Sequence, residues 1–209
     1  MYIYIKRVID FALALVGLIM LSPVFLIVAA AIKLESPGTA FFKQKRLGKD
    51  GVVFNIYKFR SMCTGAESGG VYERKGDARV TKIGRFIRAL SIDELPQFIN
   101  ILRGEMSIIG PRPTLTYHPW PLEEYSQEQK KRFDVRPGVT GWAQIHGRKG
   151  LQWNRRIEYD VEYVQRISFL LDMEIFLQTI VKVILMESNI NVSETAVKSE
   201  KPVSTEVKA

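Results

Sequence analysis

An uncharged apolar run over residues 11–32, FALALVGLIMLSPVFLIVAAAI, dominates the hydrophobic pattern of the chain. A helix of about 20 such residues is long enough to cross the hydrocarbon core of a bilayer. Pro23 lies near the middle of the run, where it removes the backbone hydrogen bond to the Ile19 carbonyl and bends the helix. Ser22 is placed to satisfy part of the freed backbone. The pattern therefore predicts a membrane helix that is broken at Ser22-Pro23.

Basic residues flank this run on both sides and bear on its orientation in a membrane. They are Lys6 and Arg7 before it, and Lys33, Lys43, Lys45 and Arg46 after it. The positive-inside rule gives such a segment no preferred direction for a full crossing. A helix that enters and leaves on the cytoplasmic side keeps both flanks beside anionic lipid headgroups. The residues alone leave a re-entrant hairpin and a full span equally open, whereas a cleaved signal peptide would need a shorter apolar run.

The segment that follows, residues 39–62, has the pattern of a β-hairpin. Val52, Phe54 and Ile56 alternate after the turn signal Lys49-Asp50-Gly51. We further expect helices over residues 83–90, 93–102, 122–133, 152–166 and 171–186, and loops over residues 64–77 and 136–150. The predicted fold class is α/β, mostly helical and irregular, with a small β-hairpin. No Gly-rich dinucleotide fingerprint follows a strand, so a Rossmann domain is not expected.

The expected helix over residues 171–186 admits two interpretations. It is very apolar, but Asp172, Glu174 and Lys182 interrupt it, which argues against a second membrane span. It is either a core helix or an amphipathic helix in the membrane interface, and both stay open. Residues 187–209 are polar and low in aromatic side chains, which is typical of a disordered tail.

The chain carries an excess of positive charge. Its 209 residues include 30 Lys and Arg against 22 Asp and Glu, for a formal net charge of +8. This balance favours an anionic partner, which could be nucleic acid, anionic lipid or a phosphorylated substrate. Cys63 is the only cysteine, so an intramolecular disulfide is excluded and a reducing compartment is expected.

Two adjacent carboxylates, Asp93 and Glu94, stand at the expected start of a helix. Ser91 and Glu94 have the spacing of a capping box, and acidic residues are favoured at a helix N-terminus. Pro96 would then stand where a backbone N–H is already needed, so the helix is expected to begin nearer Asp93. Helix capping alone would explain the pair, and a chemical role needs a second observation.

Basic residues beside Gly or Pro supply that second observation. They occur in Lys58-Phe59-Arg60, Gly110-Pro111-Arg112-Pro113 and Gly147-Arg148. An arginine in a rigid turn suits bidentate phosphate binding, because the guanidinium fork is preorganised. A carboxylate among such arginines can hold Mg²⁺ on a diphosphate. It can also attack phosphorus and form an aspartyl phosphate.

In this order, the motifs resemble those of the monotopic phosphoglycosyl transferases, or bacterial sugar transferases. The resemblance runs from Lys6 to about Met186 and is most specific over residues 90–97, LSIDELPQ. It also includes Ser22-Pro23, residues 58–62 (KFRSM), residues 110–113 (GPRP), residues 136–144 (RPGVTGWAQ), Gly147-Arg148 and residues 168–172 (SFLLD). His146 departs from the family pattern and affects only the expected local structure of that loop.

The resemblance implies a function and an architecture. A short, catalytic-domain-only member would transfer a sugar-1-phosphate from a UDP-sugar to polyprenyl (undecaprenyl) phosphate with release of UMP. This would be the first membrane step of glycoconjugate or polysaccharide assembly, on the cytoplasmic face of the bacterial inner membrane. Residues 1–35 would form a re-entrant hairpin, residues 36–186 a catalytic domain at the interface with amphipathic helices, and residues 187–209 the tail.

The resemblance also implies roles for single residues. Asp93 would be the nucleophile that carries the phosphosugar, and Glu94 would support metal binding or proton transfer. The required Mg²⁺ would be held by these two carboxylates. The substrate-binding residues would be Lys58, Arg60, Arg88, Arg112, Gln144 and Arg148.

Other classes of function explain fewer of these features. A membrane-anchored nucleic-acid-binding protein would use the positive charge, but few aromatic residues interleave the basic patches, so no nucleic-acid partner is expected. In a membrane scaffold the acidic pair would only cap a helix, and Asp93→Asn would cost about 1 kcal/mol of stability without a chemical effect. A lipid phosphatase would form the same aspartyl phosphate but pass the phosphoryl group to water.

Overall fold

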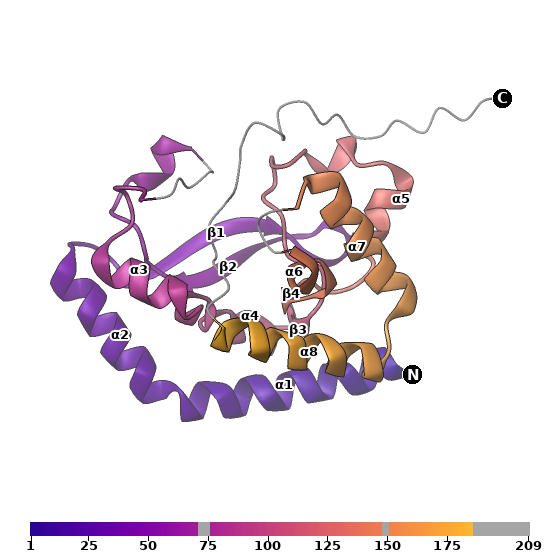
Figure 1. Ribbon diagram of the computed structural model, residues 1–209, viewed down its shortest axis with the longest axis horizontal. Helices are drawn as coiled ribbons and strands as arrows, with labels where there is room; N and C mark the ends of the chain where they lie inside the picture. The colour runs from indigo at the N-terminus through magenta and orange to yellow at the C-terminus, as the bar shows by residue number, and fades with distance from the viewer. Residues whose placement is uncertain (71–75, 148–150, 186–209) are drawn as a thin grey trace.

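Two long helices form one edge of the molecule, and a small domain of short helices and strands rests on them (Figure 1). The computed structural model describes residues 1–70, 76–147 and 151–185. Arg148 and the predicted tail over residues 187–209 lie outside these ranges. The described part is mostly helical, with one antiparallel and one parallel pair of strands.

The break in the N-terminal apolar run lies where the sequence predicts it. α1 (Tyr2–Met20) and α2 (Ser22–Glu35) meet at a bend of 61°. The Ser22 hydroxyl donates to the Ile19 carbonyl at 2.8 Å and so replaces the hydrogen bond that Pro23 removes. Among the described helices, none taken singly has the length and apolarity for a bilayer crossing, and only the bent α1–α2 pair has them jointly.

The predicted β-hairpin is confirmed. β1 (Phe41–Leu47) pairs with β2 (Val53–Phe59) in antiparallel register, and a 3₁₀ turn over Lys49–Gly51 joins them. Asp50 and Gly51 adopt left-handed conformations there, with φ of 56° and 74°, as a tight turn requires. Residues two apart on a strand share a face. Phe42, Gln44 and Arg46 of β1 therefore project on the same side of the hairpin.

The loop expected over residues 136–150 is wrong in part. The chain forms β4 (Gly138–Thr140), which pairs in parallel with β3 (Ser107–Ile109), and then α6 (Trp142–Gly147). Strands of three residues are too short to show an alternating pattern. Gly138 is required because a Cβ there would lie 2.1 Å from the Gly110 nitrogen.

The capping box at Ser91 and Glu94 is also wrong. Ser91 has a left-handed backbone with φ of 57° and no capping hydrogen bond, whereas an N-cap residue needs an extended backbone. A 3₁₀ turn over Ile92–Glu94 follows, and α4 begins only after Pro96, over Gln97–Leu102. The acidic pair therefore lies in a tight turn before the helix.

The single helix expected over residues 122–133 is instead three short pieces. They are 3₁₀ turns over Leu122–Glu124 and Lys131–Phe133 with α5 (Gln127–Lys130) between them. Ser126 and Gln129 form a capping box that starts α5. This Ser-x-x-Gln spacing was a helix-start signal that the sequence analysis missed.

The other expected helices are confirmed as α3 (Lys82–Ala89), α7 (Trp153–Arg166) and α8 (Phe169–Ile184), and a further 3₁₀ turn covers Ala66–Gly69. α8 has two different faces. Leu171 and Ile175 are buried in a core cluster with Trp142 and Tyr163. Large apolar side chains on its other face are exposed, including Leu170 and Ile184.

Candidate functional site

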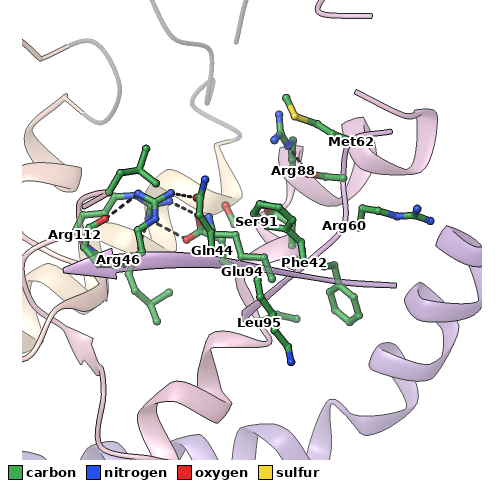
Figure 2. A pocket seen from close by; sticks show the side chains of 18 of the residues that line it. Phe42, Gln44, Arg46, Arg60, Met62, Arg88, Ser91, Glu94, Leu95 and Arg112 are labelled. Carbon is green, nitrogen blue, oxygen red and sulfur yellow. Dashed lines mark hydrogen bonds and ion pairs between the residues drawn. The ribbon is translucent and has the colours of Figure 1, made fainter. Parts of the chain in front are cut away.

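A cavity of about 1,530 Å³ brings together the β1–β2 hairpin, the turn with the acidic pair, the 110–118 loop, α6 and α8. Figure 2 shows part of its lining, with Glu94 and Arg112 grouped beside Gln44 and Arg46 of β1. The cavity is lined by the predicted site residues Lys58, Arg60, Arg88, Asp93, Glu94, Arg112 and Gln144. Residues that are far apart in the sequence thus meet in one site.

Glu94 is held by two cations. Its carboxylate accepts from Lys58 Nζ at 2.8 Å and from Arg112 Nη1 at 3.1 Å, and Arg112 Nη2 also donates to it. Burial alone would raise the pKa of Glu94, but Arg112 and Lys58 together hold the pKa well below its usual value. Glu94 is therefore ionised and fixes the Arg112 fork at the cavity wall.

Asp93 lies beside Glu94 but differs from it in its contacts and in the direction of its pKa shift. Its side chain is 8% exposed, and within the described ranges its carboxylate makes no hydrogen bond or ion pair. Burial raises the pKa of Asp93, with Lys58 opposing this and Glu94 adding to it. Of the two adjacent carboxylates, Glu94 is bound to Lys58 and Arg112, whereas the Asp93 oxygens can accept a ligand.

Arg46 is a cavity residue that the sequence analysis assigned to the basic flank of the membrane helix. Its Nη2 donates to Gln44 Oε1 at 2.5 Å, and its Nη1 donates to the Pro113 carbonyl at 3.1 Å. Burial and the neighbouring Arg112 lower the pKa of Arg46 to about 10. The alternation of Phe42, Gln44 and Arg46 along β1 was the signal that could have placed it on the cavity face.

Arg88 and Arg60 line the other end of the cavity (Figure 2). Arg88, near the end of α3, donates from Nε to the Ser61 hydroxyl at 2.7 Å. Arg60 donates to the Ser36 carbonyl at 2.8 Å and also to the Pro37 carbonyl. Its contacts attach the C-terminal end of α2 to the domain, so Arg60 has a structural role, and phosphate binding by it stays a prediction.

Gln144 has a buried amide without a partner. Neither Oε1 nor Nε2 makes a hydrogen bond with the residues that the structure describes. A buried polar group left in this way costs about 1–3 kcal/mol, so such groups normally meet a ligand or water. Its place on the cavity wall agrees with the predicted contact to substrate, which stays a prediction.

The side chains at the cavity carry more positive than negative charge. Nine lysine and arginine side chains line the cavity against two carboxylates, those of Asp93 and Glu94, an excess of seven positive charges. An anionic ligand such as a diphosphate would offset part of this excess.

Mg²⁺ usually binds through one or two carboxylates, with phosphate oxygens and water as the other ligands. In the described part of the chain, no group of three or more His, Cys, Asp or Glu side chains gathers to form a complete protein cage. Asp93 is without a partner there, and Glu94 Oε2 accepts only one hydrogen bond. The pair therefore fits a metal that is shared with a bound diphosphate.

Comparisons with known proteins identify the family of the chain. A model of the bacterial sugar transferase family matches residues 1–186. An "uncharacterized sugar transferase EpsL" of Bacillus subtilis is 43% identical over 183 residues, which cover 88% of this chain and 89% of that protein.

Two longer relatives have names that state an activity. The UDP-glucose:undecaprenyl-phosphate glucose-1-phosphate transferase of Escherichia coli is 42% identical over 85% of this chain and 40% of its own length. The UDP-N-acetylgalactosamine-undecaprenyl-phosphate N-acetylgalactosaminephosphotransferase of Aeromonas hydrophila is 44% identical over 86% of this chain and 43% of its own length. The chain therefore spans about two fifths of these two relatives. Because the family model covers most of the sequence, the chain belongs to the bacterial sugar transferase family.

Proposed function

We propose that this protein transfers a sugar-1-phosphate from a UDP-sugar to undecaprenyl phosphate and releases UMP. The observation that carries the proposal is the contrast within the acidic pair: Glu94 is clasped by Lys58 and Arg112, while Asp93 meets the cavity with no partner among the described residues. A nucleophile must have a free oxygen, and the surrounding cations offset the charge that would repel a carboxylate from a phosphate.

In the first step, an Asp93 oxygen attacks the sugar-linked phosphorus of the donor. The bond from this phosphorus to the bridging oxygen breaks, and UMP leaves with that oxygen. The phosphosugar remains on Asp93 as an acyl phosphate. In the second step, a phosphate oxygen of the acceptor attacks the same phosphorus, and Asp93 leaves as a carboxylate.

The cations have separate tasks in this scheme. Lys58 and Arg112 are held by Glu94, so they are preorganised to stabilise charge on the transferred phosphoryl group. Arg46 and Arg88 extend the positive surface on two sides of the acidic pair. Asp93 and Glu94 would hold Mg²⁺, which would supply positive charge to offset the charge on the leaving phosphate.

We also propose that α1 and α2 form a re-entrant hairpin and that the domain over residues 36–186 works at the cytoplasmic face of the inner membrane. Large exposed apolar side chains support this and occur on α1, α2 and α8; they include Ile19, Met20, Leu26, Ile27, Leu170 and Ile184. The acceptor phosphate lies at headgroup depth, so a site held there would receive it without extracting the lipid. Anionic lipids would bind the basic flanks.

The decisive experiment separates the two steps. The purified protein is incubated with Mg²⁺ and a panel of UDP-sugars without lipid, and intact mass and UMP release are measured. We expect a mass gain of one phosphosugar, absent from Asp93→Asn. The donor that produces the gain identifies the transferred sugar.

Other results would change the proposal in defined ways. Turnover with undecaprenyl phosphate but no adduct in its absence would favour direct transfer and exclude the covalent step. UMP release followed by loss of the adduct to water, with no transfer to lipid, would favour a phosphatase. No reaction with any donor, with or without lipid, would reject the proposed activity.

A further inference from the structure

α8 forms a wall with the cavity on one side and an apolar surface on the other. Thr179, Lys182 and Val183 line the cavity, and their i, i+3, i+4 spacing puts them on one helix face. Ile180 and Ile184 are exposed, with Ile184 at 72%. Near its C-terminal end, α8 thus presents a cation to the cavity next to a surface suited to lipid.

A chain of contacts connects this wall to the acidic pair. Arg112, which donates to both oxygens of Glu94, also donates to the Val139 carbonyl on β4 at 3.4 Å. The next residue, Thr140, has its hydroxyl 2.8 Å from the hydroxyl of Thr179 on α8. The wall and the carboxylates therefore belong to one connected site.

The cavity also has apolar lining that leads toward the membrane helix. Leu90, Leu95 and Phe98 line it beside the turn that carries the acidic pair. The Phe98 ring packs on α1 at Gly17, where a Cβ would lie only 2.8 Å from the ring. A ligand with a phosphate head and a hydrocarbon chain would find a cation and an apolar path within the same cavity.

Gln144 adds a polar group on the same side. α6, which carries Gln144, packs against α8, and the buried Gln144 amide has no partner among the described residues. An amide N–H and the Lys182 ammonium are both donors to phosphate oxygens. Neither group is needed to hold Glu94 or Asp93.

We infer that Lys182, with Gln144, binds the phosphate of the polyprenyl phosphate acceptor, while Leu95 and Phe98 contact its first isoprene units. The inference rests on the proposed function and assigns a separate subsite to the second half-reaction. Held there, an acceptor phosphate oxygen forms the new bond to the Asp93-linked phosphorus as the bond to the Asp93 carboxylate breaks. No proton is transferred when the acceptor is the dianion.

The test measures the two half-reactions separately in the full-length protein, using undecaprenyl phosphate in nanodiscs as the acceptor. Lys182→Ala should form the phosphosugar adduct at a rate within about twofold of wild type. In this variant, the acceptor concentration that gives half-maximal adduct discharge should rise about tenfold or more, because a charge-assisted hydrogen bond is lost. Lys182→Glu should be more impaired, and Lys182→Arg should stay within about threefold of wild type.

Lys49→Ala is the matched control, because it removes one lysine charge at the exposed hairpin turn. It should leave the acceptor dependence unchanged. An unchanged acceptor dependence in Lys182→Ala and Lys182→Glu, or an equal loss in adduct formation, would overturn the inference and leave the proposed function intact. If the wild type turns over without an adduct, a raised steady-state KM for the acceptor in Lys182→Ala would support the inference and an unchanged KM would overturn it. A wild type without any turnover would reject the proposed function and this inference with it.

Discussion

Lys6 Nζ on α1 lies 2.8 Å from the Asp172 carboxylate on α8, and both side chains are almost fully buried. Tyr163 of α7 donates to the other Asp172 oxygen at 2.7 Å, and Tyr2 donates to the oxygen that Lys6 contacts. One carboxylate thus joins the start of the first helix to the start of α8. The apolar N-terminal helix is fixed to the domain by a polar network as well as by packing.

Removing the cation from this network should destabilise the fold. Lys6→Met leaves Asp172 buried with two hydroxyl donors but no counter-charge, and breaking a buried ion pair costs about 3–5 kcal/mol. We expect a clear fall in the unfolding temperature of the detergent-solubilised protein. Glu162→Gln is the control, since it breaks an exposed pair with Arg166 and should cost below about 0.5 kcal/mol. Equal falls in unfolding temperature for Lys6→Met and Glu162→Gln would contradict a stabilising role for burial of the ion pair.

The bend between α1 and α2 should depend on Pro23. Pro23→Ala restores the backbone N–H and removes the ring that forces the kink, so the two helices should straighten. Spin labels at the exposed positions Tyr4 and Leu34, in a Cys63→Ser background, would report a longer distance between the helix ends.

Ser22→Ala is the matched variant for this measurement. It removes the hydrogen bond to the Ile19 carbonyl, with a cost of about 1 kcal/mol, but keeps the proline. The spin-label distance should therefore stay at its wild-type value. An unchanged distance in Pro23→Ala would mean that contacts with the domain hold the bend.

Features with a local cause were predictable from the sequence. The break needs only Pro23, and the hairpin needs only an alternating pattern around an Asp-Gly turn. Structure set by distant contacts was not predictable. Gly138 and Gly141 suggest a loop, but Gly138 begins the three-residue strand β4 and Gly141 lies between β4 and α6. Both are required because their backbones approach that of Gly110 closely.

The same distinction applies to the site. Asp93, Glu94 and Arg112 were recognised from motifs, but the Lys58 and Arg112 contacts that distinguish the two carboxylates arise only when distant segments meet. Arg46 was assigned to lipid headgroups from its position after an apolar run. The strand alternation could have put it on one face with Gln44, but its place beside Arg112 depends on a distant loop.

Glu94 should stabilise the protein at neutral pH. Burial alone would raise its pKa, but Arg112 and Lys58 lower the pKa well below the usual 4.5. A lowered folded-state pKa gives stability that is present above about pH 4.5 and is lost as the pH falls toward the folded-state value. Glu94→Gln should therefore unfold at a lower temperature than wild type at pH 7, with a smaller difference near pH 4. A difference that grows on acidification would contradict the ion-pair geometry.

Asp93 should behave in the opposite way. Burial raises its pKa above the usual 3.8, and its carboxylate has no ion-pair partner among the described residues. A raised folded-state pKa gives stability that is present below about pH 3.8 and is lost as the pH rises through the folded-state value. Asp93→Asn should therefore raise the unfolding temperature at pH 7 while it abolishes adduct formation. A fall of about 1 kcal/mol in stability would instead favour a purely structural role for Asp93 in the turn before α4.

Arg46 should contribute to donor binding. Its guanidinium is buried at the cavity beside Arg112, and Gln44 and the Pro113 carbonyl fix its orientation. Arg46→Gln removes one of the positive charges close to the acidic pair. We expect the KM for the UDP-sugar to rise about tenfold or more, through loss of a charge-assisted contact with the diphosphate.

A lysine at the end of the same hairpin gives a control for this effect. Lys49 carries the same charge but is exposed at the hairpin turn, away from the residues that line the cavity. Lys49→Gln should leave the KM for the UDP-sugar unchanged, and raising the salt concentration should not narrow the difference in KM between the two variants, because a buried contact is poorly screened. Equal increases in KM would mean that the donor responds to the overall basic surface, and Arg46 would then have no specific place in the diphosphate site.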